Sequence, residues 1–421
     1  MKTVIMAGGK GTRISSLAAD IPKPMIKIKG KPILEYQIES LSKQGSDEFI
    51  FIIGHLGNII EEYFGNGSKW NVCIEYIQEK YPLGTAGALY YLKDKIKEDF
   101  LLINGDIIFD VDINRFYKYH MEKKGWATIL THPNSHPYDS GLIITDNNNK
   151  VIQWVHKEQS RINYKNRVNA GIHLLSPNVF ELFNEEKKVD LDREILQAMI
   201  SEELLYAYDS PEYVKDMGTP DRYKRVCTDL ENGFVQLKNL KNKQRAVFLD
   251  RDGTLNIYKG FISKVQDIEL IEGVSEAVKT INESGYLAIV ITNQPVIARG
   301  ECGWQELNAI NNKVEMLLGE KGAYLDDIFV CPHHPDKGFA GEQLEYKIDC
   351  ECRKPKPGLL FKAAQKYNID LDQSYMVGDH LRDYNAGTMA GCKSVILAAK
   401  DSFAQESCDS LLEFVNKFIV K

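Results

Sequence analysis

The sequence has no long hydrophobic run, no excess of basic residues and no repeated or low-complexity segment. Its longest uncharged apolar stretch, from Phe49 to Ile60, is too short to cross a bilayer, and the apolar run before Gly8 is too short for a secretory signal. The net charge of -7 offers no basic footprint for nucleic acid, so anionic substrates must be held by local clusters. We therefore predict a cytoplasmic protein that binds neither membranes nor nucleic acid.

Cysteines are few, and only one group of them is clustered. Of the eight, five stand singly along the chain, whereas Cys331, Cys350 and Cys352 lie near His333. One imidazole and three thiolates in two close pairs suit a closed tetrahedral Zn²⁺ site that leaves no position for water. We predict a structural zinc site at these four residues in a reducing compartment, in preference to disulfides.

Length and composition indicate two folded domains. A chain of 421 residues exceeds what one hydrophobic core usually supports, and 43% hydrophobic with 26% charged residues is ordinary for globular proteins. Helical periodicity over residues 221–230 stops at Asn232-Gly233, and residues 238–245 carry four Lys or Arg among polar neighbours. We predict domains at 1–236 and 245–421, joined by a solvated linker at 237–244.

A glycine-rich segment follows the first predicted strand of the first domain. Residues 3–7 (TVIMA) have the pattern of a strand, and residues 8–13 (GGKGTR) follow directly. Missing side chains let backbone N–H groups approach phosphate oxygens, and Arg13 adds positive charge there. Further on, the stiff segment at 22–25 (PKPM) can hold Lys23 towards the same phosphates. The pattern predicts a phosphate-binding loop.

These segments resemble the sugar-phosphate nucleotidyltransferase family, and more matches follow in the family's order up to about residue 230. They are Gln78 with residues 83–88 (LGTAGA), Asn104-Gly-Asp106, residues 168–171 (VNAG) and residues 215–220 (KDMGTP). The resemblance implies a Rossmann-like α/β domain with a mixed sheet. It also implies attack of a sugar 1-phosphate on the nucleotide α-phosphorus, with release of pyrophosphate and no covalent intermediate.

The resemblance further implies roles for individual residues. Arg13 and Lys23 would be catalytic and would stabilise charge that develops in the transition state. Asp106, at the end of an apolar strand, and Asp216 would bind Mg²⁺. The sugar phosphate would contact Lys157, Asn169 and Gly171, and the nucleotide would contact Ala7, Gly8, Gly9, Gly11, Thr12, Gln78, Gly84 and Thr85.

One segment departs from the family's pattern. Where the family commonly has Glu-Lys-Pro before the Val-Asn-Ala-Gly motif, this chain has His156-Lys157-Glu158. Lys157 can still reach a sugar phosphate, but His156 replaces the glutamate that would bind sugar hydroxyls. The departure leaves the identity of the sugar open, and a structural, half-buried His156 is the alternative to a ligand-binding one.

The second predicted domain opens on an apolar strand that runs into two carboxylates. Residues 246–249 (AVFL) lead to Asp250, and Asp252 follows before a Gly-Thr turn. This is how a buried parallel strand delivers carboxylates to its C-terminal edge. One Asp can attack phosphorus while the other exchanges a proton with the attacking or leaving oxygen. The stretch predicts a phosphoryl-transfer site.

Strand and helix patterns alternate after this stretch, which predicts a parallel sheet with active residues at successive strand ends. We expect helices near 274–284 and 304–318 and strands at 287–292 and 328–330. Thr292 can bind a phosphoryl oxygen, and Lys354 can offset negative charge on the nucleophile and phosphate. Asp379, with Asp383 four residues on, adds a strand-end carboxylate for Mg²⁺.

In this order, the pieces resemble the haloacid dehalogenase (HAD) phosphatase superfamily over about residues 245–400. The resemblance implies that Asp250 is a nucleophile that forms an aspartyl-phosphate and that Asp252 is a general acid and then a base. Mg²⁺ would be held by Asp250, Asp379 and the backbone carbonyl of Asp252. The short distance from Thr254 to the next helix predicts little or no cap domain.

The predicted zinc loop narrows this second resemblance. Together with residues 292–294 (TNQ) and 297–300 (IARG), it is similar to the heptose bisphosphate and histidinol phosphate phosphatases. Pro295-Val296 departs from the Ser-Gly common in that branch, which leaves substrate detail around this turn open.

The two resemblances constrain each other. A domain that consumes a sugar 1-phosphate would lose its substrate if the attached phosphatase hydrolysed that same phosphate. We therefore expect a sugar bisphosphate whose distal phosphate is removed first. This matches the resemblance of the halves to D-glycero-D-manno-heptose 1,7-bisphosphate phosphatases and heptose 1-phosphate guanylyltransferases, with GTP as nucleotide and Mg²⁺ at both sites.

Two alternatives stay open on the sequence. One is a hexose 1-phosphate nucleotidyltransferase that uses UTP, dTTP or GTP, fused to a histidinol-phosphate-type or broad sugar phosphatase. The other is a sensor whose first half binds a sugar nucleotide without catalysis, although mere binding would not require Arg13, Lys23, Asp106 and Asp216 together. The predicted partners are sugar phosphates and a nucleoside triphosphate, and the oligomeric state is open.

Overall fold

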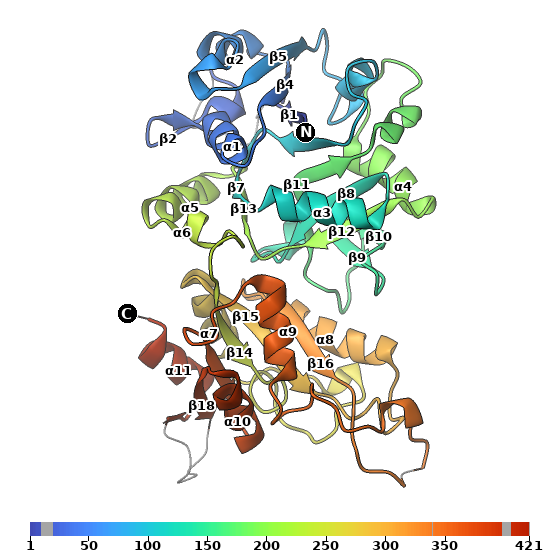
Figure 1. The fold of residues 1–421 in the computed structure, drawn as a ribbon, viewed down its shortest axis with the longest axis vertical. Helices are drawn as coiled ribbons and strands as arrows, with labels where there is room; N and C mark the ends of the chain where they lie inside the picture. Colours follow the sequence, from blue (N-terminus) through green and yellow to red (C-terminus); the bar gives the residue numbers. More distant parts are fainter. Residues whose placement is uncertain (10–19, 339, 398–405, 421) are drawn as a thin grey trace. The chain divides into compact units, whose positions relative to one another are not determined.

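The computed structural model describes residues 1–9, 20–338, 340–397 and 406–420 (Figure 1). Internal contacts divide the chain into two compact units. Unit 1 comprises Met1–His132, Ile143–Trp154 and Asn169–Asn239, and unit 2 comprises Pro133–Leu142, Val155–Val168 and Leu240–Lys421. The domain limits 1–236 and 245–421 stay a prediction. Within the described ranges, none of the helices combines the length and apolarity needed to cross a membrane.

The main sheet of the first half is mixed, as predicted. Its order is β10-β9-β11-β6-β1-β4-β5, and β8 pairs with both β11 and β12. Strands β5, β4, β1 and β6 run parallel, whereas β11 is antiparallel to β6. The strands are β1 (Thr3–Met6), β4 (Glu48–Ile53), β5 (Cys73–Gln78), β6 (Phe100–Asn104), β8 (Ala127–His132), β9 (Leu142–Thr145), β10 (Val151–Val155), β11 (Val168–Leu175) and β12 (Leu205–Asp209).

The position of β1 in this sheet determines where a ligand can bind. The chain passes from β1 to β4 and β5 on one side and then returns to place β6 on the other side of β1. Val4 and Ile5 belong to different hydrophobic cores, so both faces of the sheet are covered. Ligands bind where the winding direction reverses, at the carboxyl ends of the strands. Here that point lies between the ends of β1 and β6.

Helices and two small ladders complete the first half. Strand β7 (Ile107–Asp110) pairs antiparallel with β13 (Tyr213–Asp216), and β2 (Lys27–Ile28) pairs with β3 (Lys31–Pro32). The α-helices are α1 (Ile33–Ser42), α2 (Gly57–Phe64), α3 (Ile113–Lys123), α4 (Gln197–Ser201), α5 (Pro220–Glu231) and α6 (Phe234–Leu237).

The sheet of unit 2 is entirely parallel, as predicted. Its order is β16-β15-β14-β17-β18-β19. The strands are β14 (Arg245–Leu249), β15 (Tyr286–Asn293), β16 (Asp327–Cys331), β17 (Tyr375–Gly378), β18 (Lys393–Leu397) and β19 (Ser407–Cys408). The helices are α7 (Val274–Glu283), α8 (Trp304–Gly319), α9 (Gly358–Tyr367), α10 (Leu381–Ala390) and α11 (Leu411–Phe418) (Figure 1). Residues 254–273 hold only the short 3₁₀ helix η8 (Val265–Asp267).

Strand β14 is the centre of unit 2. Val247 and Leu249 pack into one hydrophobic core, and Ala246 and Phe248 pack into another. This alternation explains the uninterrupted apolar run, because both faces of the strand are buried. The winding direction reverses between β14 and β17, so Asp250 leaves the sheet at its switch point.

The segment predicted to be a solvated linker is only partly exposed. Residues 241–243 are exposed, but Leu240 packs into the hydrophobic core of unit 2 and Gln244 is buried. Gln244 bridges to Ile369, and the side-chain amide of Asn368 donates to the carbonyl of Leu240. The predicted solvation therefore holds only for part of the segment, because Leu240 and Gln244 have partners in unit 2.

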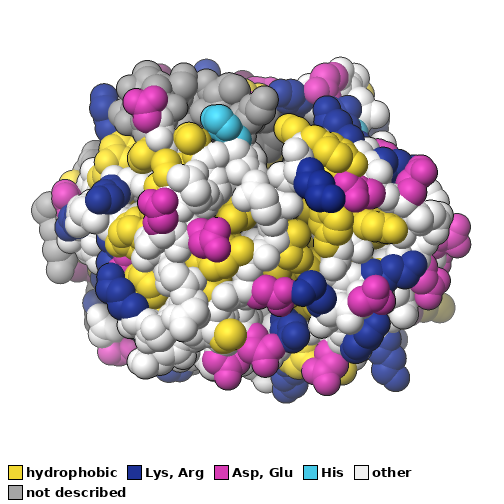
Figure 2. All heavy atoms as spheres, turned by 90° about the horizontal axis from the view of Figure 1, so that it is seen from above, with side chains coloured by type: hydrophobic (Ala, Val, Ile, Leu, Met, Phe, Trp, Pro, Cys, Tyr) yellow, Lys and Arg dark blue, Asp and Glu magenta, His cyan; other side chains and the backbone are white. Residues whose placement is uncertain are grey.

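The charged side chains are mixed on the face that Figure 2 shows. Lys and Arg are interspersed with Asp and Glu among the described residues of that view, and neither sign forms a continuous patch. Opposite charges so close together largely cancel beyond a Debye length of about 8 Å. Anion binding on this face therefore depends on local groups, as the net charge predicted.

Candidate active sites

A buried lysine joins two carboxylates at the switch point of unit 2. Asp250 follows β14 directly, and its backbone N–H donates to Val377 of β17. The Lys354 ammonium lies 2.8 Å from Oδ1 of Asp250 and 2.6 Å from Oδ1 of Asp383, and it donates to the carbonyl of Ile291. Exposure of Asp250, Lys354 and Asp383 does not exceed 3%. The three charged groups are therefore almost completely shielded from solvent.

Burial and charge together set the protonation of this cluster. Burial raises the pKa of Asp250, and the neighbouring Asp383 adds to that rise, while Lys354 opposes it. Burial alone would lower the pKa of Lys354, but its two carboxylate partners raise it overall. The two carboxylates thus favour the charged form of Lys354, which in turn favours the ionised form of Asp250.

Asp252 is held by three neighbouring side chains. Arg251 donates to both of its carboxylate oxygens, at 3.0 and 2.9 Å, and the amides of Asn256 and Gln294 donate at 3.0 and 2.7 Å. Burial raises the pKa of Asp252, but Arg251 and these hydrogen bonds outweigh burial and leave the pKa below its usual value. The sequence does not indicate Gln294 as a partner, because it lies 42 residues from Asp252, whereas Arg251 and Asn256 are within four residues of it.

Thr292 and its neighbour lie at the end of β15, beside the same cluster. The hydroxyl oxygen of Thr292 accepts a hydrogen bond from the amide of Gln294 at 2.8 Å. Asn293 exchanges two hydrogen bonds with the backbone of Lys354, at 3.0 and 3.1 Å. These bonds fix the loop that carries Lys354 against the end of β15.

Three carboxylates form a group that could hold a cation. Oxygens of Asp250, Asp379 and Asp383 lie within 4.8 Å of one another. Oδ1 of Asp379 is buried and has no hydrogen-bond partner in the described part of the chain. The three carboxylates carry more negative charge than Lys354 alone can neutralise. Their oxygens are also hard ligands, so the group fits a divalent cation such as Mg²⁺. Asp383, four residues after Asp379, thus lies with the predicted Mg²⁺ ligands, and the predicted contact of the Asp252 backbone carbonyl stays a prediction.

The four predicted zinc ligands lie together. The sulfur of Cys352 is 3.3 Å from both other sulfurs and 3.2 Å from Nδ1 of His333, and all four ligand atoms lie within 4.8 Å of one another. Sulfurs bound to one tetrahedral Zn²⁺ are about 3.8 Å apart. The sulfurs of Cys331 and Cys350 lie 3.7 Å apart, so a small outward shift of Cys352 lets the set hold zinc. The hydrogen bond between Cys352 and Cys331 is the main cause that lowers the pKa of Cys352 to about 5. A thiolate at Cys352 is what a metal ligand requires.

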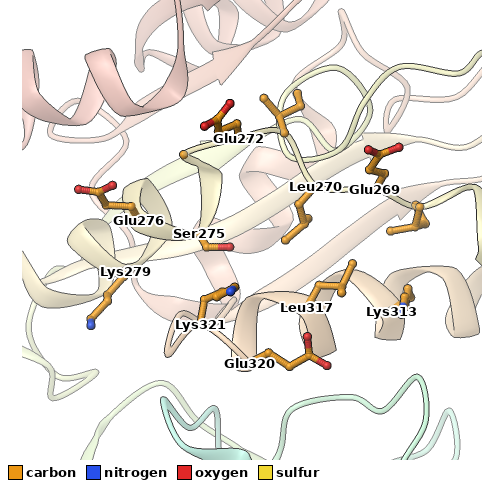
Figure 3. Close-up of a pocket in the computed structure, with 13 residues that line it drawn as sticks. Glu269, Leu270, Glu272, Ser275, Glu276, Lys279, Lys313, Leu317, Glu320 and Lys321 are labelled. Atoms are coloured by element: carbon orange, nitrogen blue, oxygen red, sulfur yellow. The ribbon is translucent and has the colours of Figure 1, made fainter.

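A separate cavity of about 730 Å³ lies over α7 and α8 (Figure 3). Its lining includes Glu272, Glu276, Lys279 and Lys321, and it contains none of the residues that we predicted to be catalytic. It is therefore no part of the carboxylate cluster.

In unit 1, the predicted phosphate loop begins at the end of β1. Ala7 is buried and its N–H donates to Ile52, and Gly8 and Gly9 follow. A side chain at Gly8 would displace the carboxylate of Glu79, which lies against this glycine. The predicted residues Gly11, Thr12 and Arg13 lie outside the described residues.

Each predicted Mg²⁺ ligand of unit 1 faces a cation from another element. Lys23, in the 3₁₀ helix η2 (Lys23–Met25), forms an ion pair with Asp106, which follows β6. Arg222 of α5 donates to both oxygens of Asp216, at 2.9 and 2.8 Å. The β7–β13 ladder sets Asp216 opposite Ile107, next to Asp106. Unit 1 thus brings Lys23, Asp106 and Asp216 to one edge.

The residues predicted to meet the base are fixed by backbone contacts. The amide of Gln78 donates to the carbonyl of Gly54 at 3.1 Å. Gly84 has φ +83° and bridges to Val189, where a side chain would collide with the Val189 carbonyl. The hydroxyl of Thr85 accepts from the N–H of Leu191 at 2.7 Å. The loop is thereby held in a conformation that only glycine adopts readily.

Two of the three predicted sugar contacts lie on β11. The N–H of Gly171 donates to Oδ1 of Asn169 at 3.1 Å, and a Cβ on Gly171, at φ +73°, would lie 2.5 Å from the amide of Asn104. Asn104 ends β6, so β11 runs beside the switch point. Lys157 is exposed in the segment Val155–Val168, which belongs to unit 2, and it is not among the residues that unit 1 brings together.

Comparison with known proteins assigns the first half. The family profile described as "Nucleotidyl transferase" matches residues 2–233. The chain belongs to the nucleotidyl transferase family. Among curated relatives of this nucleotidyltransferase, the mannose-1-phosphate guanylyltransferase of Mycobacterium tuberculosis is 28% identical over 253 residues, which are 59% of this chain and 70% of that protein.

The second half of the nucleotidyltransferase chain has different relatives. The "HAD-hydrolase-like" profile matches residues 351–416. The D-glycero-beta-D-manno-heptose-1,7-bisphosphate 7-phosphatase of Haemophilus ducreyi is 44% identical over 155 residues, which are 37% of this chain and 82% of that protein. The two profiles and these curated relatives show that the enzyme combines a nucleotidyltransferase with a HAD-like phosphatase in sugar-nucleotide biosynthesis.

A solved structure of HddC from Yersinia pseudotuberculosis, complexed with GMP-PN, covers 54% of this chain, more than the second half alone, and 99% of that chain at 27% identity, with a TM-score of 0.48.

Proposed function

We propose that this enzyme removes the 7-phosphate of D-glycero-D-manno-heptose 1,7-bisphosphate and then transfers a guanylyl group from GTP to the heptose 1-phosphate. The observation that carries the proposal is the complete buried cluster of Asp250, Lys354 and Asp383 in a half 44% identical to a named heptose bisphosphate 7-phosphatase. The name of the mannose-1-phosphate guanylyltransferase relative supports GTP as the donor.

The order of the two reactions follows from their chemistry. The transferase needs the anomeric phosphate as its nucleophile, so the phosphatase has to act on the distal one. The heptose 1-phosphate that it releases is then the substrate of the first half, and the products are GDP-heptose and pyrophosphate.

In the phosphatase half, Asp250 attacks the distal phosphorus. Lys354 and the N–H of Arg251 both bind Oδ1 of Asp250, which leaves Oδ2 as the attacking oxygen. The bond between phosphorus and the sugar oxygen breaks, and an aspartyl-phosphate forms. Water then attacks phosphorus, frees Asp250 and yields inorganic phosphate. Thr292 is placed to bind a phosphoryl oxygen.

Asp252 moves the protons of both steps. It gives a proton to the leaving sugar oxygen and later takes one from the attacking water. Alone it is ionised, because Arg251 and two amides lower its pKa. A bound phosphate dianion adds negative charge beside Asp252 and raises this pKa towards the protonated form that the first step requires.

Metal ions complete the proposal. Asp250 and Asp379 with the Asp252 carbonyl in the phosphatase half, and Asp106 and Asp216 in the transferase half, would hold Mg²⁺, which offsets phosphate charge when bound. Zn²⁺ at Cys331, His333, Cys350 and Cys352 would be structural and would secure the loop before Lys354. We also propose a cytoplasmic location, where thiols stay reduced and can bind zinc.

In the transferase half, protein side chains position and neutralise phosphates and form no covalent bond. Lys23 reaches Asp106 from η2, so it lies beside the predicted metal ligands and close to where the nucleotide phosphates would bind. Together with Arg13 it would stabilise charge on the α-phosphorus and on departing pyrophosphate. Asn169 and Gly171 would contact the sugar.

The test is phosphorus NMR of the purified enzyme with heptose 1,7-bisphosphate, GTP and Mg²⁺. We expect the distal phosphate signal to disappear first, and GDP-heptose and pyrophosphate to accumulate afterwards. A bisphosphate that remains intact with metal-replete enzyme would overturn the heptose assignment. Loss of the distal phosphate without pyrophosphate would retain the phosphatase and overturn the guanylyl step with this anomer.

A hexose 1-phosphate is the second candidate acceptor, favoured by the relative named mannose-1-phosphate guanylyltransferase. Under this alternative, mannose 1-phosphate and GTP yield pyrophosphate faster than heptose 1-phosphate and GTP do. Initial rates of pyrophosphate release with both sugars, each with GTP, UTP and dTTP, decide between the candidates.

A further inference from the structure

Unit 1 contains a carboxylate that no step of the proposed reaction uses. Asp192 is the second residue of the π-helix η7 (Leu191–Leu196) and is half-buried. Its Oδ1 lies 3.5 Å from the side-chain amide nitrogen of Asn169. Burial raises the pKa of Asp192 to about 7, and the charge of Asp190 adds to this effect. Perturbed carboxylates in partly enclosed positions are candidates for function.

The amide of Asn169 is oriented by a buried histidine. Oδ1 of Asn169 accepts from the N–H of Gly171 and lies 3.1 Å from Nε2 of His173. Burial lowers the pKa of His173 to about 4, so the ring is neutral, and Nε2 must carry its proton because the amide oxygen can only accept. Asn169 therefore turns its NH₂ group towards Asp192. The NH₂ group of Asn169, a hydrogen-bond donor, thus lies next to the carboxylate of Asp192, an acceptor.

Backbone contacts place Asp192 next to the nucleotide loop. The N–H of the preceding residue, Leu191, donates to Thr85, and Val189 exchanges hydrogen bonds with Leu83 and Ala86 on the same loop. Asp192 thus lies between Thr85, predicted to meet the nucleotide, and Asn169, predicted to meet the sugar. A sugar 1-phosphate has to occupy this position for its phosphate oxygen to reach the α-phosphorus of the nucleotide.

We propose that Asp192 accepts hydrogen bonds from hydroxyl groups of the sugar ring and, together with Asn169, determines which sugar 1-phosphate the transferase accepts. This inference rests on the proposed function. Neighbouring ring hydroxyls can both donate to one carboxylate, while the NH₂ of Asn169 donates to a hydroxyl oxygen. The chain has His156 where its family commonly has a sugar-binding glutamate, and Asp192 supplies a carboxylate from a different element.

The test compares Asp192→Asn with a matched control, Asp190→Asn. Asp190 caps η7 through the N–H of Arg193 at 2.9 Å, and asparagine caps equally well, so both variants remove one charge from the same turn. Transfer from GTP is measured with the preferred sugar 1-phosphate and with its monodeoxy analogues. Phosphatase activity of the same samples reports that each variant is folded.

Assayed above pH 7, where Asp192 is ionised, Asp192→Asn should lower kcat/KM about 10- to 100-fold on the parent sugar, mainly through KM, because hydrogen bonds to a charged group are lost. On the deoxy analogue that lacks the bonded hydroxyl, the variant and the wild type should be equal. Asp190→Asn should stay within about twofold of the wild type on every sugar, as a surface charge does.

Two results would overturn the inference. One is an Asp192→Asn enzyme with unchanged kcat/KM on the parent sugar. The other is an equal loss on the parent and on every deoxy analogue, which would show that Asp192 is only structural. A wild-type enzyme that transfers to no sugar 1-phosphate would instead overturn the proposed function itself.

Discussion

The two candidate sites occupy the same topological position but differ in burial. In each half, the chain adds strands on one side of its first strand and then places the next strand on the other side. The site lies at the carboxyl ends of the strands where this change of side occurs. In unit 2, Asp250 and Lys354 are 3% and 2% exposed. In unit 1, the side chain of Asp106 is 34% exposed, and that of Lys23 is 16% exposed.

This difference in burial follows from the different requirements of the two reactions. A carboxylate that attacks phosphorus itself has to be held in place and kept largely free of competing water, and the low local dielectric strengthens its contact with Lys354. A transferase that forms no covalent bond needs cations near an entering triphosphate, and the nucleotide brings its own charge. The same fold position therefore supports a closed site in one half and an open one in the other.

The largest expected effect comes from Asp250→Asn. We expect phosphatase activity to fall by at least about 10⁴-fold, because the nucleophile is removed. Nucleotidyl transfer from heptose 1-phosphate should change less than about twofold, because unit 1 contributes its own residues. Phosphate release and pyrophosphate release, measured on one preparation, check both statements. Loss of both activities in a folded variant would contradict independent sites.

An intermediate effect is expected when Lys354 or Lys23 is replaced singly by methionine. Lys354→Met and Lys23→Met should each lower the activity of their own half by about 10²- to 10³-fold. Lys354→Met should also destabilise unit 2 by about 3–5 kcal/mol, because it leaves buried carboxylates without a counter-charge. Lys23→Met should cost less than about 1 kcal/mol, because its ion pair is partly solvated.

Urea unfolding of the full-length variants, with the activity of the unaltered half as an internal control, measures this contrast between the lysines. Equal destabilisation by the two changes would mean that burial does not distinguish the sites.

The smallest effect on catalysis is expected at the zinc ligands. Cys350→Ser should abolish stoichiometric zinc, measured by metal analysis, and lower phosphatase activity about tenfold, since the loop that carries Lys354 loses its anchor. Nucleotidyl transfer should be unaffected. The exposed, unclustered Cys73 provides the matched control, and Cys73→Ser should retain one zinc per chain. Full phosphatase activity in zinc-free Cys350→Ser would show that the loop needs no metal.

Much of the fold could be predicted from local sequence. Strand patterns at residues 246–249 and 287–292 and helix patterns at 274–284 and 304–318 match β14, β15, α7 and α8 to within a few residues, because hydrophobic periodicity reflects which faces are buried. The predicted solvation of the linker does not hold at Leu240 and Gln244, because polar composition does not show which backbone groups will find partners in a neighbouring element.

The sequence by itself determined which residue types stand at the strand ends and metal sites. The tertiary structure decided which side chains lie within bonding distance of one another. Asp250, Asp252, Lys354 and the zinc ligands could be identified because strand ends and close pairs of ligands are local patterns. The contacts of Gln294 with Asp252 and of Asn169 with Asp192 could not be identified, because each joins residues that are distant in the sequence and meet only in the folded chain. Sequence spacing specifies residue types at an edge, whereas packing across strands sets their distances and their pKa values.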